Sequence, residues 1–343
     1  MKTMGKRPTQ GEVARVAGVS TAVVSYVLNN GPRPVSEDAR RRVLAAMAQT
    51  GYRPNNIARA LAHGQSSVFG LVVPDLANPF LAQLAQGLER AFSARGYSLL
   101  IADSGDDADR EAGVLETLMS QQVAGLVWYG VDQPLPLHIV ESTALPVVLL
   151  NAPSGSEFTP REGRFISVNT DERGHAQLAT THLIEHGRTR IAHLGGPAER
   201  LNARERARGW TDALRLAGLA PAGRCAAPFT REGGHDAVPA LLALDPDAVL
   251  ASNEMQAIGL LAGLHRAGVR VPDDIAVVGL NGTAGARFTV PALTAVHLSI
   301  ERLATDIADA LAPGSTRTTI ETDARLVLRD SCGCPPGDEG QQP

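Results

Sequence analysis

Apolar residues recur along this chain at two different spacings, and the spacing changes near residue 68. Residues 9–62 repeat apolar positions at helical spacing in short segments that are separated by capping residues and glycines. From Val68 onward, apolar runs of strand length alternate with helical stretches, which is the pattern of βαβ units and doubly wound parallel sheets. We therefore expect a small all-α module followed by an α/β domain.

The N-terminal pattern predicts three short helices. Thr9, Ser20 and Ser36 each precede an apolar-periodic segment, and such residues cap helix N-termini. Gly18 and Gly51 follow the first and third segments, where glycine commonly ends a helix. A fourth segment, residues 55–62, is too short to form a stable helix by itself.

Seven strands are predicted in the α/β part, in two series separated by the polar stretch 151–164. That stretch is rich in Pro, Gly and Glu, so we expect the chain to cross there between two lobes, and to cross again near residues 291–293. The first series is 68–74, 98–103, 124–130 and 145–151, and the second is 190–196, 247–253 and 274–280.

Charge is distributed unevenly between these two parts. Residues 1–63 contain ten Lys and Arg against three Asp and Glu, so their balance is 10 − 3 = +7. The whole chain has a formal charge of −4, so the remainder carries −4 − 7 = −11. A basic end on an acidic body indicates a polyanionic partner at that end, although a basic solvated tail has the same composition.

The three cysteines, Cys225, Cys332 and Cys334, are too few for a disulfide framework, which favours a reducing cytoplasm. The first residues lack the apolar core of a signal peptide, and no run reaches about 18 apolar residues. We therefore expect a cytoplasmic protein with no membrane partner.

Residues 13–29 carry the most specific motif in the chain. A helix-turn-helix needs two short helices that cross steeply through a tight turn containing glycine, and residues 17–20, Ala-Gly-Val-Ser, fit that turn. Ala14, Val19, Val24 and Val27 are placed to face inward. The alternative is a helical hairpin that packs together without binding DNA. The net positive charge of residues 1–63 and the third helix argue against it.

At these residues the chain resembles the LacI/GalR repressor family, and the resemblance covers nearly all of it. The matching segments are 13–14, 17–20, 24–25, 27–29, 51–55 and 57–61. The resemblance implies a dimeric, ligand-responsive transcription factor that binds double-stranded operator DNA. It also implies the fold class: an N-terminal all-α helix-turn-helix (lambda-repressor-like) module plus a two-lobed, periplasmic-binding-protein-like α/β domain with doubly wound parallel sheets.

The resemblance also assigns DNA-contacting residues. Many relatives carry Thr where Val23 stands and Arg where Tyr26 stands, and losing an Arg–guanine contact would shift base preference. Residues 55–62 resemble a hinge helix that enters the minor groove, with Leu61 as an apolar wedge that bends the DNA. The implied DNA-binding residues are Thr21, Ala22, Ser25, Tyr26, Asn29, Asn55, Ala58 and Leu61.

The remainder resembles the family's sensor, which binds a small molecule between its lobes near the carboxyl ends of the strands. Several residues of this sensor, taken singly, also have an interpretation without a ligand. Asn78 and Asn281 could belong to turns, Phe229 to the hydrophobic core and Arg206 to the charged surface. Many relatives have Asp at Asn151 and Asn281, so the pocket suits an anion such as a sugar acid or sugar phosphate, with a neutral sugar as the alternative. The implied effector-binding residues are Asp75, Asn78, Phe80, Asn151, Arg206, Phe229, Asn253 and Asn281.

An α/β enzyme and a transport-type solute-binding protein are the competing functions. No phosphate loop, dinucleotide fingerprint, nucleophile elbow or zinc-protease motif supports an enzyme, and a solute-binding protein should carry a signal peptide. His182 and His186 have metal-ligand spacing and Cys332-Gly-Cys334 suits half a metal site or a redox pair, but the sequence favours solvated histidines and free thiols. We expect no cofactor and no metal.

The expected organisation follows from these patterns. Residues 1–54 form the DNA-binding domain, residues 55–66 the hinge helix and linker, and residues 67–330 the effector-binding and dimerisation domain. Its first lobe is expected at about 67–162 and 292–322, its second lobe at about 163–291 and 323–330, and residues 331–343 are expected to be a disordered tail. We expect a homodimer, because two-fold pairing doubles the base contacts on a palindrome. The tail has no leucine heptads, so we do not expect a tetramer built by a C-terminal coiled coil.

Overall fold

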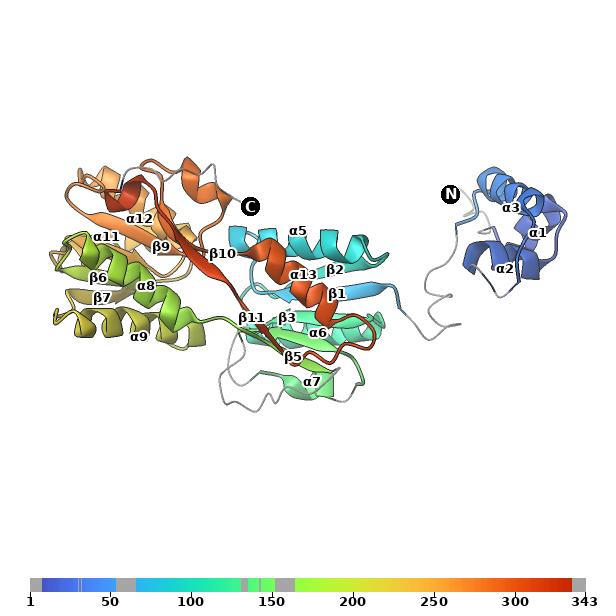
Figure 1. Cartoon of the computed structure of the whole chain (residues 1–343), viewed down its shortest axis with the longest axis horizontal. Helices are drawn as coiled ribbons and strands as arrows, with labels where there is room; N and C mark the ends of the chain where they lie inside the picture. Colours follow the sequence, from blue (N-terminus) through green and yellow to red (C-terminus); the bar gives the residue numbers. More distant parts are fainter. Residues whose placement is uncertain are drawn as a thin grey trace, which may run out of the picture. The chain divides into compact units, whose positions relative to one another are not determined.

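The computed structural model describes residues 8–29, 31, 33–53, 66–130, 135–141, 143–151 and 164–334, with the side chain of Asn29 excepted. The chain divides into two compact units, Met1–Ser66 and Ser67–Pro343. Figure 1 shows a helical first unit and a second unit of two α/β lobes. The predicted fold class, a helical module followed by two doubly wound sheets, is confirmed.

The first unit consists of α1 (Gln10–Ala17), α2 (Thr21–Asn29) and α3 (Glu37–Thr50). The Thr9 and Ser36 side chains accept hydrogen bonds from backbone N–H groups in the first turns of α1 and α3, as their sequence pattern predicts. Gly18 ends α1 at φ 64°, a left-handed conformation that glycine adopts without a Cβ penalty. The core beneath the three helices is small and apolar, and it includes Val13, Val24 and Val43.

The first lobe is built on a six-stranded parallel sheet among the described residues, in the order β11-β5-β4-β3-β1-β2. Its core packs α5 and α13 against one face of the sheet, around Phe92, Leu88 and Ile307. The strands are β1 (Val68–Val73), β2 (Ser98–Asp103), β3 (Gly125–Tyr129), β4 (Val147–Leu150), β5 (Phe165–Asn169) and β11 (Thr319–Glu321). The helices are α5 (Pro79–Ser93), α6 (Ala108–Ser120), α7 (Leu137–Glu141) and α13 (Ile300–Ala310).

The second lobe repeats this plan, with a six-stranded sheet among the described residues in the order β12-β10-β9-β8-β6-β7. Only the β10–β12 pair in it is antiparallel among those residues. The strands are β6 (Ile191–Gly195), β7 (Gly223–Ala226), β8 (Ala248–Ala251), β9 (Ala276–Leu280), β10 (Thr294–Leu298) and β12 (Ala324–Val327). The helices are α8 (Glu172–Glu185), α9 (Leu201–Leu216), α10 (Arg231–Asp236), α11 (Val238–Leu242) and α12 (Glu254–Arg266), with the 3₁₀ turns η1 (Ala284–Phe288) and η2 (Asp330–Cys332).

The chain crosses between the lobes after β5, after β10 and between β11 and β12, so the predicted lobe boundaries are wrong. Residues 165–169 pair with β4 and β11 in the first sheet, and residues 294–298 belong to the second sheet. β5 was not predicted because the strand is short and carries polar residues. The polar stretch before β5 was interpreted as the crossover instead. Thr322 donates its N–H to the Asn169 carbonyl (3.2 Å), which joins two of the crossing segments.

The predicted disordered tail begins too early. Residues 331–334 are ordered against the second lobe: Ser331 is fully buried, and its hydroxyl donates to the Val277 carbonyl of β9 at 2.6 Å. Cys332 and Cys334 are also buried, within the core that includes Leu183 and Val296. Ser331 finds a hydrogen-bond partner on β9, and the two cysteines pack into an apolar core. These contacts order the segment, and composition alone does not reveal them. Residues 335–343 lie outside the described residues.

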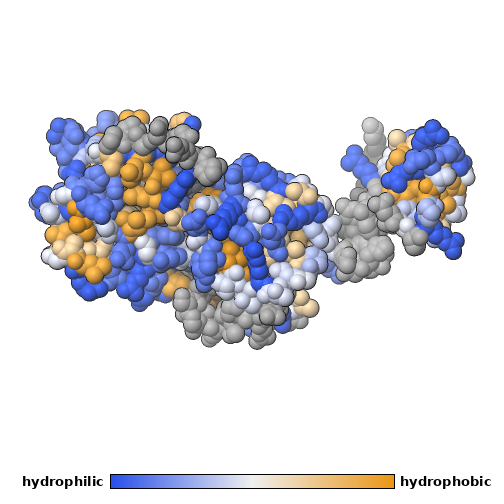
Figure 2. Space-filling view, viewed as in Figure 1, coloured by the Kyte–Doolittle hydropathy of each residue, from blue (hydrophilic) through white to orange (hydrophobic). Residues whose placement is uncertain are grey.

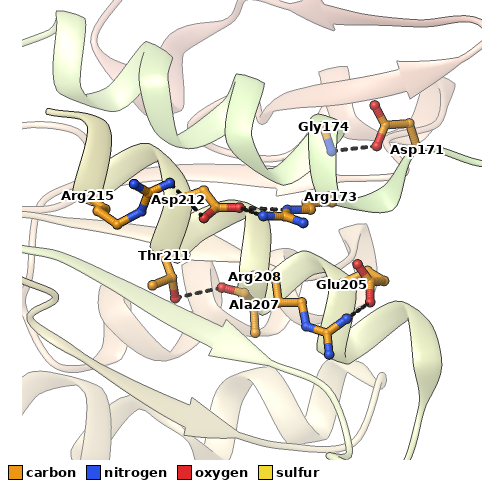
Figure 3. A network of polar contacts seen from close by, with 9 residues as sticks. All are labelled: Asp171, Arg173, Gly174, Glu205, Ala207, Arg208, Thr211, Asp212 and Arg215. Carbon is orange, nitrogen blue, oxygen red and sulfur yellow. Dashed lines mark hydrogen bonds and ion pairs between the residues drawn. The ribbon is translucent and has the colours of Figure 1, made fainter.

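Helices α8 and α9 pack closely on the second lobe and are joined at their surface by a polar network (Figure 3). Gly209 permits this approach, because a Cβ there would lie 2.0 Å from the Arg173 carbonyl oxygen. Arg173 and Arg215 both donate to Asp212, and the hydrogen bond from Arg173 lowers the pKa of that carboxyl group. These contacts hold α9 against α8, and α9 supplies Asn202 and Arg206 to the cavity described below.

Figure 2 shows a largely hydrophilic surface on this face of the molecule, interrupted by apolar patches. Within the described part of the chain, no single helix is long and apolar enough to cross a membrane; the bent pair α1–α2 meets that test only by length and composition.

Candidate functional site

A cavity of about 320 Å³ lies between the two lobes of the second unit. Its walls come from the segments that follow β1, β2, β3 and β4 in the first lobe and β6, β7, β8 and β9 in the second lobe. In doubly wound sheets, the carboxyl ends of the strands form a crevice where the strand order reverses, and both sheets present that edge here.

All eight effector residues predicted from the sequence line this cavity. They come from both lobes, since Asp75, Asn78, Phe80 and Asn151 belong to the first and the other four to the second. The structure therefore brings together residues that are up to 206 positions apart in the chain (281 − 75). Their role in binding a ligand remains a proposal.

The asparagines of the cavity also have local backbone roles. Asn151 and Asn281 adopt left-handed conformations, at φ 60° and φ 53°, directly after β4 and β9. Asn tolerates that conformation better than most residues, which gives a structural reason for Asn at both turns. Asn78 and Asn253 cap α5 and α12 through their side-chain oxygens. These asparagines therefore shape the local backbone and also line the cavity.

Arg206 is the best-anchored residue of the cavity. Its side chain is only 2% exposed, and its Nε and Nη2 atoms donate to the two carboxylate oxygens of Glu172 at 2.7 and 2.9 Å. Nη1 donates to the Ser252 carbonyl at 2.7 Å. Burial lowers the pKa of Arg206, but the Glu172 carboxylate outweighs that effect and leaves the pKa above its ordinary value. Arg206 is therefore held in one position by the protein itself.

A second ion pair crosses the cavity between the lobes. Arg200, which precedes α9 in the second lobe, approaches Asp106 of the first lobe with Nη2 and Oδ1 2.9 Å apart. Both arginines of the cavity wall, Arg200 and Arg206, are thus paired with a carboxylate. Among the described residues, the cavity wall therefore carries no arginine whose charge is left unmatched for an anionic ligand. Of the residues in these two pairs, only Arg206 was predicted from the sequence.

Tyr129 and Asn202 also line the cavity and were missed by the sequence analysis. Burial, with the nearby Glu172 carboxylate, raises the pKa of Tyr129 to about 12, so its hydroxyl stays protonated at neutral pH. Asn202 is only 8% exposed, and its Oδ1 has no hydrogen-bond partner among the described residues. Its position one helical turn before Arg206 is the sequence signal that could have found it.

The side of the cavity in the second lobe carries an aromatic ring. Phe229 lies against Gly196, where an added Cβ would be 2.0 Å from the ring, and the guanidinium carbon of Arg206 is 5.7 Å from the ring centroid. The Nδ2 of Asn253 donates to the Phe229 carbonyl at 3.2 Å. Asn253 therefore holds the backbone of Phe229, while its ring packs on Gly196 near the Arg206 guanidinium, an arrangement that suits stacking.

In the first unit, α1 and α2 bend by 105° relative to each other, within the range of helix-turn-helix pairs. Val24 and Val27 of α2 are buried, as predicted, whereas Thr21 and Ala22 are exposed and Ser25 and Tyr26 are partly exposed. The predicted reading face is thus open on α2. The side chain of Asn29 and residues Asn55, Ala58 and Leu61 lie outside the described residues.

The third helix supports that arrangement with basic side chains. Arg42 of α3 donates from Nη1 to the Ala17 carbonyl at the end of α1, at 3.2 Å. Arg40 and Arg41 stand beside it on the same helix and contribute to the basic character of the unit. Cations placed next to an exposed recognition helix are suited to phosphate contacts.

Comparison with known proteins assigns the chain to a family. Residues 9–55 match the "Bacterial regulatory proteins, lacI family" and residues 180–332 match the "Periplasmic binding protein-like domain". The ribose operon repressor of Escherichia coli (strain K12) is 35% identical over 326 residues, which cover 93% of this chain and 96% of the relative. The chain belongs to the lacI family of bacterial regulatory proteins. The resemblance predicted from the sequence is confirmed.

Two further matches agree with this membership. The transcriptional repressor PurR of Photobacterium profundum is 30% identical, over 93% of this chain and 97% of its own. The crystal structure of a Lac repressor dimer bound to operator and the anti-inducer ONPF superposes with a TM-score of 0.83 at 25% identity, covering 95% of this chain and 99% of the other. These lacI family relatives are repressors, so an enzyme and a transport protein are not supported.

Proposed function

We propose that this lacI family member is a cytoplasmic repressor that binds a near-palindromic operator as a homodimer and responds to a small neutral sugar in the cavity between its lobes. The observation that carries the proposal is the convergence of all eight predicted ligand residues, from both lobes, on one cavity. The named relatives are repressors, and one neighbouring structure is a dimer on its operator.

The DNA-binding part of the proposal rests on α2. Thr21 and Ala22 stand exposed on this helix, with Ser25 and Tyr26 partly exposed beside them. We propose that this face enters the major groove, where short side chains at a helix N-terminus approach base edges. The net charge of +7 over residues 1–63 supplies the attraction to phosphate. Residues 55–62 keep their predicted role as the hinge.

The charge balance of the cavity favours a neutral ligand over the anion suggested by the sequence. The guanidinium of Arg206 is matched by Glu172, that of Arg200 by Asp106, and Asp75 adds a further carboxylate. Amides at Asn202 and Asn281 offer both donors and acceptors to hydroxyl groups. The cavity volume lies at the lower end of the range found for small-molecule pockets, which suits a monosaccharide.

A ligand held by both lobes stabilises the closed arrangement of the second unit, since it contacts both walls only when they are close. It can change operator affinity only by its differential affinity for the closed and open arrangements, typically about 1–3 kcal/mol. That coupling corresponds to a change of about 5- to 150-fold in operator affinity.

The dimer is supported by an exposed apolar edge in the first lobe. β2 is the edge strand of its sheet, and Leu100 and Ile101 on it are 41% and 44% exposed. An unpaired strand edge carrying neighbouring apolar side chains tends to associate with another chain. We assign this edge to contact with a second copy of the protein.

The experiment selects the operator from random DNA and then titrates it with protein at several salt concentrations and with a panel of sugars. We expect affinity to fall steeply with salt, through counterion release, and to change with a neutral monosaccharide but not with sugar acids or phosphates. Salt-independent binding with no selected consensus would refute the DNA assignment.

The variant Asn202→Ala tests the cavity. Its Oδ1 has no partner among the described residues and Ala suits a helix, so we expect little loss of stability. The sugar concentration that gives half the response should rise about 5- to 10-fold, the worth of one hydrogen bond. Thr211→Ala, on the same helix but outside the cavity, is the matched control. An unchanged response in Asn202→Ala would place the ligand elsewhere.

A further inference from the structure

Four soft metal ligands meet on the second lobe, away from the cavity. His182 lies in the last turn of α8, His186 caps the C-terminus of that helix, and Cys332 and Cys334 stand in and just after η2. The ligand atoms of His182, Cys332 and Cys334 all lie within 4.8 Å of one another. The Sγ of Cys334 is 3.7 Å from Nε2 of His182 and 3.1 Å from Nε2 of His186.

The fold holds both halves of this cluster in place. Residues four apart on a helix share a face, and the two imidazole centroids on α8 are 4.4 Å apart. The cysteine segment is anchored by Ser331, which accepts from the Thr294 N–H at 2.9 Å and donates to β9. Gly333, at φ 93°, turns the chain between the two cysteines so that both sulfurs reach α8. The sequence analysis treated the two pairs separately, because 148 residues separate Cys334 from His186.

The donor set selects the metal. Two thiolate sulfurs and two imidazole nitrogens form the Cys₂His₂ set of tetrahedral structural zinc sites. With Zn–S near 2.3 Å and Zn–N near 2.0 Å, a tetrahedron separates its sulfur and nitrogen ligands by about 3.5 Å. The two distances at Cys334, 3.7 and 3.1 Å, bracket that value. No carboxylate belongs to the set among the described residues, which disfavours Mg²⁺ and Ca²⁺.

We propose that His182, His186, Cys332 and Cys334 bind one Zn²⁺ ion. Four protein ligands leave no position for a substrate, so the ion is structural rather than catalytic. It clamps the end of the second lobe to α8, where His182, Cys332 and Cys334 are at least nine-tenths buried. This inference is independent of the proposed effector and operator, because none of the four residues lines the cavity.

A disulfide between Cys332 and Cys334 is the competing chemistry. Both cysteines are free thiols in the structure. A disulfide would use both sulfurs and leave only two histidines, so the two outcomes exclude each other.

The experiment measures metal in the full-length protein purified under reducing conditions without added chelator. We expect about one Zn²⁺ per chain, and we expect Co²⁺ loaded in its place to give the thiolate charge-transfer and d–d absorption of a tetrahedral site. Cys332→Ser and Cys334→Ser should each weaken the charge-transfer band, and the double variant should abolish it. His186→Gln, at an exposed position that folding tolerates, should weaken metal affinity at least about 10-fold.

Cys225→Ser is the matched control, since Cys225 lies on β7 outside the cluster and should keep full metal content. The proposal is overturned if reduced protein holds no stoichiometric zinc and gives no thiolate band with Co²⁺. It is also overturned if mass spectrometry finds a Cys332–Cys334 disulfide in freshly purified protein, or if Cys225→Ser loses as much metal as the cluster variants.

Discussion

The guanidinium of Arg200 and the carboxylate of Asp106 join the two lobes across the candidate ligand cavity, 2.9 Å apart. Their side chains differ in exposure, at 12% and 57%, so solvent screens the pair only from one side. Because the partners belong to different lobes, the pair favours the closed arrangement even before a ligand enters. We therefore expect lobe closure, and with it the ligand response, to depend on this contact.

Asp106→Asn should weaken ligand binding by raising the population of the open arrangement. Asp106 sits at φ 59°, which Asn tolerates, so the substitution removes the charge without straining the backbone. A partly exposed pair contributes about 0.2–1 kcal/mol, so the ligand concentration for half response should rise about 1.5- to 5-fold. Calorimetric titration measures it, with Asp309→Asn, which breaks a pair with Arg95 inside the first lobe, as control. Equal shifts in both variants would argue against a role in closure.

Arg206→Met should destabilise the second lobe as well as abolish the ligand response. The substitution leaves Glu172 buried at 12% side-chain exposure without its bidentate partner. Removing one member of a buried ion pair typically costs about 3–5 kcal/mol, whereas replacing both members is often nearly neutral. Chemical denaturation of Arg206→Met, Glu172→Leu and the double variant measures this cost. We expect the double variant to be more stable than Arg206→Met, and additive losses would contradict the prediction.

Ile101→Glu should convert the dimer to monomers and abolish operator binding. The side chain is 44% exposed on the edge strand β2, and a charge placed in an apolar interface must be desolvated. Sedimentation velocity reports the oligomeric state. Leu216→Glu, at a position 67% exposed at the end of α9, should remain dimeric. A dimeric Ile101→Glu protein at the same concentration would move the interface to another face.

His193 should make the stability of the second lobe fall as pH decreases below about 6.5. Burial, with minor contributions from nearby arginines, lowers the pKa of His193 to about 3. Between these pH values the unfolded chain binds a proton that the folded chain does not, so stability present above pH 6.5 is lost as pH falls. The slope is about 1.4 kcal/mol per pH unit.

Denaturation of wild type and His193→Gln between pH 7 and pH 5 isolates this contribution, because other titrating groups are common to both proteins. Gln retains a donor toward Ser252, whose Oγ lies 2.8 Å from His193 Nε2. The variant should show a shallower pH dependence than wild type. Parallel pH profiles for wild type and His193→Gln would be the contrary result.

Tyr26→Arg should change the preferred operator sequence rather than overall affinity alone. Tyr26 is partly exposed on α2, and its ring packs against Gly31, where an added Cβ would be 2.5 Å from Cδ1. Arg offers a bidentate contact to guanine that Tyr lacks. Selection from random DNA measures the consensus of both proteins. Arg40→Ala on α3 should lower affinity without altering the consensus, and an identical consensus for Tyr26→Arg would remove Tyr26 from the base-reading set.

Local sequence patterns were enough to predict the helix-turn-helix and the doubly wound sheets, and the resemblance to the LacI/GalR family added the eight residues that line the cavity. Caps such as Thr9 and Ser36, the turn at Gly18 and the apolar runs of the buried strands act over a few residues, so their signals are local. Residues at the carboxyl ends of parallel strands converge in every doubly wound sheet, which made Asn151 and Asn281 predictable as cavity residues once their strands were recognised.

The pairing of residues far apart in the chain became visible in the folded structure alone. Strand β5 joins the first sheet through partners on β4 and β11, more than 150 residues apart from each other, and no local pattern reports such pairing. The partners of Arg206 and Arg200, which change the expected ligand from an anion to a neutral sugar, lie on other elements. The same holds for His186 and Cys334, since side-chain contacts depend on packing geometry, whereas local sequence encodes only backbone preference and burial.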